Sequence, residues 1–224
     1  MTIEPIAIFR SPIGGKFGVP RQAGLVPELH GTISFIEPYN NADALRGLDG
    51  FDYIWLLWAF SMSGRSQEFK ATVRPPRLGG NERIGVFASR SPFRPNGLGL
   101  SSVRIAGIDF EKCEIQVLGA DLADGTPIYD VKPYVEYADS HRDVRSGFVQ
   151  SHAWDPLEVI VPDNVAAVFK TEEVDALKGI LSQDPRPQYH DNPARIYGLV
   201  FKGKDVKFKV EGSTLSVVGI EDTK

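Results

Sequence analysis

The 224-residue sequence contains little cysteine, no long apolar run and no excess of basic residues. Its single cysteine, Cys113, excludes an intramolecular disulfide and any metal site built from several cysteines. The longest apolar run covers residues 54–60, far short of the roughly 20 residues that a membrane-spanning helix needs. Because the N-terminus shows no signal-peptide pattern, we expect a cytoplasmic protein that does not contact membranes.

Motifs of common cofactor and metal sites are also absent. The sequence has no GxGxxG after a predicted strand, no GxxxxGK[ST] and no HExxH. Its four histidines are isolated from one another along the chain. We therefore expect no metal site and no nucleotide site of the Rossmann or P-loop kind.

The net charge is −4, from 25 Lys and Arg against 29 Asp and Glu, which at first argues against a nucleic-acid partner. The basic residues are unevenly distributed, however. Residues 65–94 hold two acidic side chains and seven basic ones, namely Arg65, Lys70, Arg74, Arg77, Arg83, Arg90 and Arg94. Arginines in a loop rich in Pro and Gly suit bidentate phosphate contacts, and ion pairs with carboxylates elsewhere are the alternative. A nucleic-acid substrate is therefore compatible with the acidic total.

Short apolar segments between 22 glycines and 16 prolines predict a mainly β fold. The candidate strands cover residues 3–9, 31–36, 53–60, 84–88, 100–108 and 114–118. The segment 53–60 is apolar at nearly every position, as in a strand covered on both faces. A short helix is expected over residues 41–48, because Asn41 is a suitable N-cap. Many short strands with one small helix favour a barrel or a strongly curved sheet.

The last third of the chain has a different pattern. Apolar residues repeat at three- and four-residue spacing over residues 163–181, where Thr171 is a candidate cap of a second helix. Residues 195–218 alternate like two strands around Glu211-Gly212. This part is expected to form a small α+β unit.

Two irregular segments near the two ends of the chain present arginine from a restricted backbone. Residues 17–24, FGVPRQAG, can project a cation and an amide through Arg21 and Gln22, although a plain surface turn is the alternative. Residues 184–189, DPRPQY, have a restricted backbone, because one proline lies on each side of Arg186. Both segments are candidates for ligand contacts.

A third segment, residues 121–134, reads DLADGTPIYDVKPY. Residues 124–127 form a turn signal, with a carboxylate, a hydroxyl and backbone groups close together. If a strand follows, Asp130 and Lys132 lie on one face together with Tyr134. They could then form an ion pair or line a polar site, and a structural hairpin is the alternative.

The sequence resembles the TrmO/TsaA family over nearly its whole length, through FGVPRQAG, TVRPPRLGGNERIGVFASRSPFRPNGLGLS, DLADGTPIYDVKPY and QDPRPQY in the right order. That family consists of S-adenosylmethionine-dependent methyltransferases that act on N6-threonylcarbamoyladenosine at position 37 of tRNA. The resemblance implies an N-terminal β-barrel domain, residues 1–140, and a small C-terminal α+β domain, residues 155–224, that carries the DPRP motif. It also implies S-adenosylmethionine as cofactor, the tRNA anticodon loop as partner, and a homodimer with cofactor sites near the subunit interface.

The resemblance also implies site residues. Expected to bind the cofactor are Pro20, Arg21, Gln22, Phe60, Ser61, Arg90, Leu100, Leu122, Ala123, Asp124 and Gly125. Family members often carry His-Gln after the apolar strand, where this chain has Ser61-Met62. Candidates for accepting the proton of the acceptor nitrogen are Asp130, Asp184 or water, and Lys132 or Arg186 could polarise the threonylcarbamoyl group. Expected to bind tRNA are Arg74, Arg77, Arg94 and Tyr189, with flipped-out bases stacking on aromatics such as Phe87, Phe93 or Tyr189.

Two other functions stay open on the sequence. One is a non-catalytic barrel that binds S-adenosylmethionine and RNA as a sensor. The other is a methyltransferase for a different acceptor, because fold and cofactor do not determine the substrate.

Overall fold

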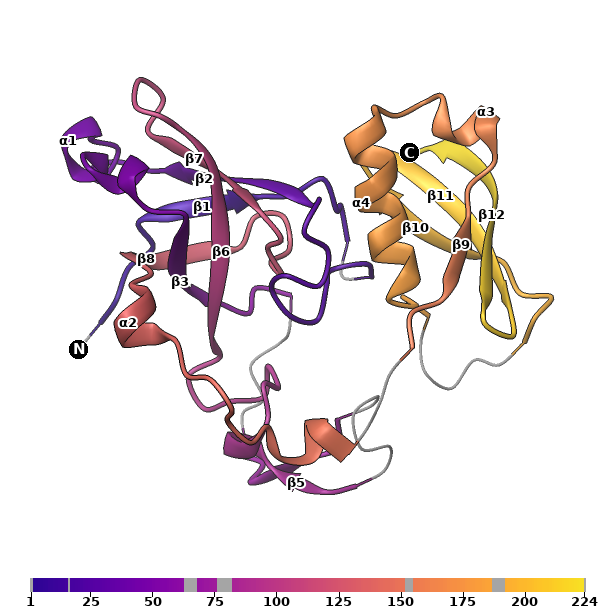
Figure 1. The fold of residues 1–224 in the computed structure, drawn as a ribbon, viewed down its shortest axis with the longest axis horizontal. Coiled ribbons are helices and arrows are strands. Elements are labelled where there is room, and N and C mark those ends of the chain that lie inside the picture. The colour runs from indigo at the N-terminus through magenta and orange to yellow at the C-terminus, as the bar shows by residue number, and fades with distance from the viewer. Residues whose placement is uncertain are drawn as a thin grey trace.

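Six antiparallel strands close a barrel in the N-terminal part of the chain (Figure 1). The computed structural model describes residues 2–15, 17–62, 68–75, 82–151, 155–186 and 192–223. The barrel strands are β1 (Ala7–Arg10), β2 (His30–Phe35), β3 (Tyr53–Ala59), β6 (Leu98–Asp109), β7 (Glu114–Leu118) and β8 (Pro127–Pro133). Their order is β1-β2-β7-β6-β3-β8, and β8 pairs back to β1. The mainly β fold with a barrel that the sequence predicts is confirmed.

Short helices and a small ribbon accompany the barrel. They are α1 (Ala42–Leu45), the 3-10 helices η1 (Leu48–Gly50), η2 (Val86–Ala88) and η3 (Gly147–Ser151), α2 (Glu136–Asp139), and the ribbon of β4 (Thr72–Val73) with β5 (Ile84–Gly85). The predicted N-cap is confirmed, because the Asn41 side chain accepts the Asp43 N–H at 2.9 Å. The ribbon lies outside the barrel, at the bottom of Figure 1.

Alternate residues of β3 fill the barrel. Ile54, Leu56 and Trp58 are buried, whereas the residues between them lie on the outer face and are partly exposed. This outer face is less covered than the sequence pattern predicted, since Tyr53 is 44% exposed. Inside, Trp58 lies against Gly99 of β6, where a Cβ would come within 2.3 Å of the indole ring. The indole therefore takes the space that a side chain at position 99 would need.

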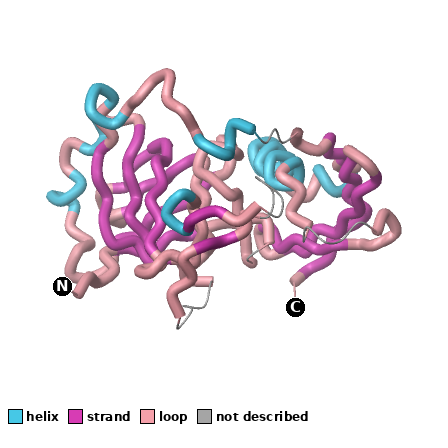
Figure 2. Tube along the Cα trace, turned by 90° about the horizontal axis from the view of Figure 1, so that it is seen from below, coloured by secondary structure: helices cyan, strands magenta, loops and turns pink. Residues whose placement is uncertain are grey.

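The C-terminal part is a four-stranded sheet with two helices. Its strands are β9 (Glu158–Ile160), β10 (Tyr197–Phe201), β11 (Lys204–Glu211) and β12 (Thr214–Asp222), in the order β10-β11-β12-β9 with β9 parallel to β12. The helices are α3 (Asp163–Ala166) and α4 (Thr171–Ser182). Figure 2 shows the barrel and this sheet side by side along the molecule.

Two local predictions for this part need correction. The N-cap of α4 is Lys170 and not Thr171, and Glu173 accepts the Lys170 backbone N–H at 3.0 Å. Residues 195–218 contain parts of three strands, not two, because the chain also reverses between β10 and β11. Both turn residues there, Lys202 and Gly203, adopt positive φ angles of 48° and 74°.

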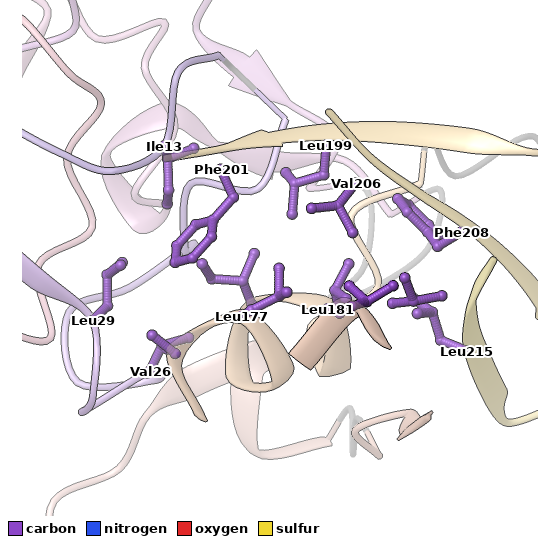
Figure 3. Packing of buried hydrophobic residues seen from close by; sticks show 14 of the residues in the cluster. Ile13, Val26, Leu29, Leu177, Leu181, Leu199, Phe201, Val206, Phe208 and Leu215 are labelled. Atoms are coloured by element: carbon purple, nitrogen blue, oxygen red, sulfur yellow. The ribbon is translucent and has the colours of Figure 1, made fainter. Parts of the chain in front are cut away.

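The loop between β1 and β2 joins the two sheets. Ile13, Val26 and Leu29 from this loop are buried in one cluster with residues of α4 and β10 (Figure 3). On the side of α4 and β10 the cluster includes Leu177, Ile180, Leu181, Leu199 and Phe201. Backbone hydrogen bonds reinforce the junction, from Gly14 N to Val200 O at 3.1 Å and from Lys202 N to Pro12 O at 2.7 Å. The C-terminal sheet is therefore packed onto a loop of the barrel.

Among the helices that the structure describes, none has both the length and the apolar character needed to cross a bilayer.

Candidate functional site

The segment that carries Arg21 and Gln22 is held between the barrel and the C-terminal sheet. Pro20 is buried. The Gly24 N–H donates to Gly119 O at 2.8 Å, and both glycines adopt positive φ angles, which other residues rarely reach. The Arg21 guanidinium donates through Nη2 to the backbone carbonyl of Gln183 at 3.1 Å. A fixed backbone thus presents an exposed cation at the end of the barrel.

A polar network connects this segment to the barrel interior. Arg90 donates to the Gln22 side-chain carbonyl. Trp58 Nε1 donates to Ser101 Oγ at 3.0 Å, and Ser101 Oγ donates to Asp121 Oδ1 at 2.6 Å. The backbone amide of Ala23, next to Gln22, bonds to Asp121 and joins the two sets of contacts, so the network runs from the core of the barrel to its end.

Asp121 is the central carboxylate of this network. Burial raises the pKa of its carboxyl group, while the hydrogen bond from Ser101, the charge of Arg90 and the backbone amide of Ala23 act in the opposite direction. A carboxylate enclosed by donors and next to an arginine is suited to bind a cationic ligand group. Asp121 opens the DLADGTPIYDVKPY motif but was not among the site residues predicted from the sequence.

The turn at residues 122–125 closes the same end of the barrel. Leu122 is buried, and the Gly125 N–H donates to Phe9 O at 2.9 Å. The Asp124 carboxylate accepts the Ser11 N–H at 3.0 Å, so it fixes the start of the loop that carries Arg21. Ala123 accepts the Thr126 N–H at 3.2 Å. The turn therefore holds Asp124 in a structural contact.

Phe60 and Ser61 extend β3 toward this turn. The Phe60 ring meets the Trp58 indole edge-on, with centroids 4.5 Å apart. Ser61 Oγ lies 3.4 Å from the hydroxyl of the buried Thr126, which directly follows the turn. Ser61 is thus placed beside the residue that follows the turn, and Phe60 packs on Trp58.

Leu100, Asp130 and Lys132 lie on a different surface, the outer wall of the barrel. Leu57 of β3 pairs with Leu100 on one side and with Asp130 on the other, and Trp55 pairs with Lys132. Leu100 is 60% exposed. Asp130 and Lys132 are both described and form no ion pair with each other. The positive charge of Lys132 acts instead on the carboxylate of Asp139. These three residues are grouped together but stand apart from Arg21 in the network.

Asp184 and Arg186 pair with each other directly after α4. Arg186 Nε donates to Asp184 Oδ1 at 2.8 Å and Nη2 donates to Oδ2 at 3.1 Å. Asp184 has a φ of 50°, in the left-handed region. Because the neighbouring Gln183 carbonyl accepts from Arg21, the DPRP motif is joined to the first motif.

The basic segment is only partly described, and Arg77 and Tyr189 fall outside the described residues. Arg94 donates through Nη1 to Ser89 O at 2.8 Å and to Val86 O at 3.3 Å. Arg74 is exposed and makes no hydrogen bond or ion pair within the described ranges. Over those same ranges, no three residues of the His, Cys, Asp and Glu types are grouped as a metal site.

Comparison with known proteins gives a consistent result. The family model of the tRNA-methyltransferase O N-terminal domain matches residues 8–140, and that of the TrmO C-terminal domain matches residues 155–223. The chain is 38% identical to a protein of Escherichia coli (strain K12) named tRNA (adenine(37)-N6)-methyltransferase, covering 97% of each chain.

Relatives from Pseudomonas aeruginosa agree. One, whose name describes an S-adenosylmethionine-dependent methyltransferase, is 38% identical over 92% of this chain and 90% of its own. The crystal structure of TrmO from that organism superposes with a TM-score of 0.78 at 30% identity, covering 99% of this chain and 98% of that one. The chain belongs to the tRNA-methyltransferase O (TrmO) family, as its four motifs predicted.

Proposed function

We propose that this protein is a cytoplasmic, S-adenosylmethionine-dependent methyltransferase that methylates N6 of adenosine 37 in tRNA. We further propose that the acceptor is the N6-threonylcarbamoyl form of that adenosine, in threonine tRNA. Residues 1–140 would carry the cofactor site, and residues 155–224 would support it and contact tRNA. The observation that carries the proposal is similarity over the full length to a relative named for the adenine(37)-N6 reaction, with all four motifs present.

The groups at the end of the barrel fit S-adenosylmethionine by charge. When bound, this cofactor supplies an electrophilic methyl group on a positively charged sulfur, and it also carries a carboxylate and an ammonium group. Arg21 and Arg90 are cations suited to its carboxylate, and Asp121 is an anion suited to its ammonium group. Asp124 is a second candidate for that contact, and one of its carboxylate oxygens accepts the Ser11 N–H.

The acceptor nitrogen has low intrinsic reactivity. It lies between an adenine ring and a carbonyl, so it is a poor nucleophile and must lose its proton. Asp130 is the stronger candidate for the proton acceptor, because both oxygens of the alternative, Asp184, accept hydrogen bonds from Arg186. Lys132 and the Arg186 guanidinium are cations that can polarise the threonylcarbamoyl group. Alignment of the acceptor with the methyl group supplies much of the remaining acceleration.

A homodimer would bring the outer wall and the end of the barrel together. The outer wall that carries Asp130 also presents Tyr53 and Leu100 as exposed apolar side chains, together with the half-buried Trp55 and Leu57. Apolar residues grouped on one face favour a protein contact. We infer that a second copy covers this wall and that Asp130 of one subunit serves the cofactor site of the other.

Transfer of labelled methyl groups tests the function. We expect label in threonine tRNA that carries the threonylcarbamoyl group and none in the same tRNA without it. Cofactor binding without transfer to any tRNA would support the sensor. Transfer to tRNA without the group would support a different acceptor. Asp130→Asn is expected to retain cofactor and tRNA binding and lose turnover, and a full rate would remove Asp130 from the chemistry.

Mixing two inactive variants tests the shared site. Arg21→Ala and Asp130→Asn damage different halves of each proposed site. After mixed refolding, about half of the dimers carry one of each subunit, and one of their two sites is intact, so about a quarter of wild-type activity should return. No recovery, with a dimer seen by sedimentation, would show that each site belongs to one chain.

A further inference from the structure

Two phenylalanines stack on each other at the surface of the β4–β5 ribbon. Phe69 and Phe87 are 61% and 68% exposed, although large apolar side chains are usually buried. Their ring centroids are 6.2 Å apart and the ring planes differ by 27°. Both aromatic faces are thus held nearly parallel while much of their area stays in contact with solvent.

The backbone under this pair is well supported. Val86, next to Phe87, is fully buried and donates its N–H to Ala71 O at 2.9 Å. The ribbon pairs Thr72 with Gly85 and Val73 with Ile84. Phe87 lies in η2, directly after β5, and Phe69 precedes β4 by three residues. The paired strands therefore restrict the backbone near both rings, which reduces the conformational entropy lost when a ligand binds.

Arg94 completes the surface. Its guanidinium lies 5.7 Å from the centroid of the Phe87 ring, and the carbonyls of Ser89 and Val86 hold it there. The described neighbours in the chain are mostly basic, with Lys70, Arg74, Arg83 and Arg90 against Glu68 and Glu82. The sequence indicated Arg94 as a direct tRNA contact, whereas the structure shows it bonded to the backbone under the aromatic pair.

We propose that Phe69, Phe87 and Arg94 form a platform on which an unpaired base of the tRNA anticodon loop stacks. The proposal rests on the function proposed above, in which tRNA is the substrate. Proteins bind single-stranded RNA by stacking bases on aromatic rings and arginine planes next to cations that contact phosphates. A second copy of this chain is a less suitable occupant, because a two-fold contact centred here would bring the same cations face to face.

Fluorescence of a modified anticodon stem–loop tests the platform directly. The probe is the stem–loop of threonine tRNA with 2-aminopurine placed at each unpaired position in turn. We expect binding to quench the fluorescence at one position and Phe87→Ala or Phe69→Ala to remove that quenching. Affinity for the stem–loop should fall roughly five- to hundredfold, with Phe87→Trp close to wild type.

Three measurements separate stacking from other effects. Melting temperature and cofactor affinity should match wild type in the Ala variants, and the salt dependence of binding should keep its slope, because stacking releases no counterions. Tyr137→Ala is the matched control, since Tyr137 on α2 is 93% exposed and should leave binding unchanged.

The outcomes also distinguish the platform from the proposed function. Methyl transfer at the wild-type rate and affinity by Phe69→Ala and Phe87→Ala would overturn the platform and leave the function intact. If the Ala variants remove the quenching but wild type transfers no methyl group to tRNA, the platform is supported and the proposed function is rejected. A weaker dimer with unchanged stem–loop affinity would overturn the platform in favour of a second copy.

Discussion

Gly179 of α4 lies directly against Val26 of the loop between β1 and β2. A Cβ atom at position 179 would come within 2.7 Å of Val26 Cγ1, closer than real Cβ contacts allow. The helix can approach the loop this closely because residue 179 has no side chain. The same loop presents Arg21, whose guanidinium reaches the end of α4 at Gln183. The C-terminal sheet therefore positions the segment that we assign to the cofactor.

Replacing Gly179 should disturb this contact. Gly179→Leu forces Val26 and α4 apart, and we expect a loss of about 1–3 kcal/mol in the free energy of unfolding. Affinity for S-adenosylmethionine should fall as well, because Arg21 and Gln22 move with the loop. Calorimetry of unfolding and of cofactor binding measures both effects. Lys178→Leu, which places the same side chain at an exposed position of α4, is the control. If both variants bind S-adenosylmethionine equally well, α4 does not position the segment that carries Arg21.

The raised pKa of Asp121 predicts a pH-dependent difference between wild type and Asp121→Asn. In the folded protein burial holds the proton on Asp121 to a higher pH than in the unfolded chain, where the pKa is near 3.8. The stability that this residue contributes is complete below that value and is lost as pH rises through the folded-state pKa. As pH rises above about 3.8 and through the raised folded-state pKa, the free energy of unfolding of the variant should therefore increase relative to that of wild type.

Denaturant titrations at each pH provide the measurement, with an unchanged m-value as the control for two-state behaviour. Parallel curves for the two proteins across that range would show that Asp121 titrates alike in the folded and unfolded states. Asp121→Asn should also weaken cofactor binding, since the neutral amide lacks the negative charge that stabilises a bound cationic group.

Two arginines of the basic segment should respond differently to salt. Arg74 is exposed and makes no hydrogen bond within the described ranges, so we assign it to a phosphate. Arg74→Ala should reduce the slope of log affinity for tRNA against log salt concentration by about one unit. Arg94→Ala should weaken binding with a smaller change of slope, because Arg94 is bonded to the backbone. The opposite order of slopes would reverse these roles.

The paired geometry of Asp184 and Arg186 makes Arg186→Lys a severe change. Lysine cannot reproduce the two parallel hydrogen bonds that the guanidinium forms with Asp184. Loss of a charge-assisted hydrogen bond should lower kcat for methyl transfer roughly ten- to a hundredfold. Cofactor affinity should change less, since the paired carboxylate of Arg186 is Asp184, in the C-terminal part of the chain. Stopped assays at saturating tRNA measure the effect, and wild-type kcat would assign the pair to folding alone.

The local features of this protein could be predicted from its sequence. The alternation of short apolar segments and the Asn41 cap depend on neighbours in the chain, so β1, β2, β3, β6, β7 and α1 were predicted near their observed places. The strand β8 was left open, and the strand predicted over residues 84–88 is β5 followed by η2, outside the barrel. The four motifs likewise identified the family, because their order and spacing are properties of the chain itself.

Contacts between distant residues were decided by the tertiary structure. Asp121 became the centre of a buried network only when folding placed Ser101, Ala23 and Arg90 around it. Folding also separated Asp130 and Lys132 from Arg21, because strand register put them on the outer wall of the barrel. Residue spacing along the chain does not show which side chains become buried and lose their hydration. Burial and the charges of residues distant in sequence set the protonation and the partners of each carboxylate and arginine. The sequence therefore determined the family and the strands of this protein, and the packing of the loop against α4 and the barrel end determined the site.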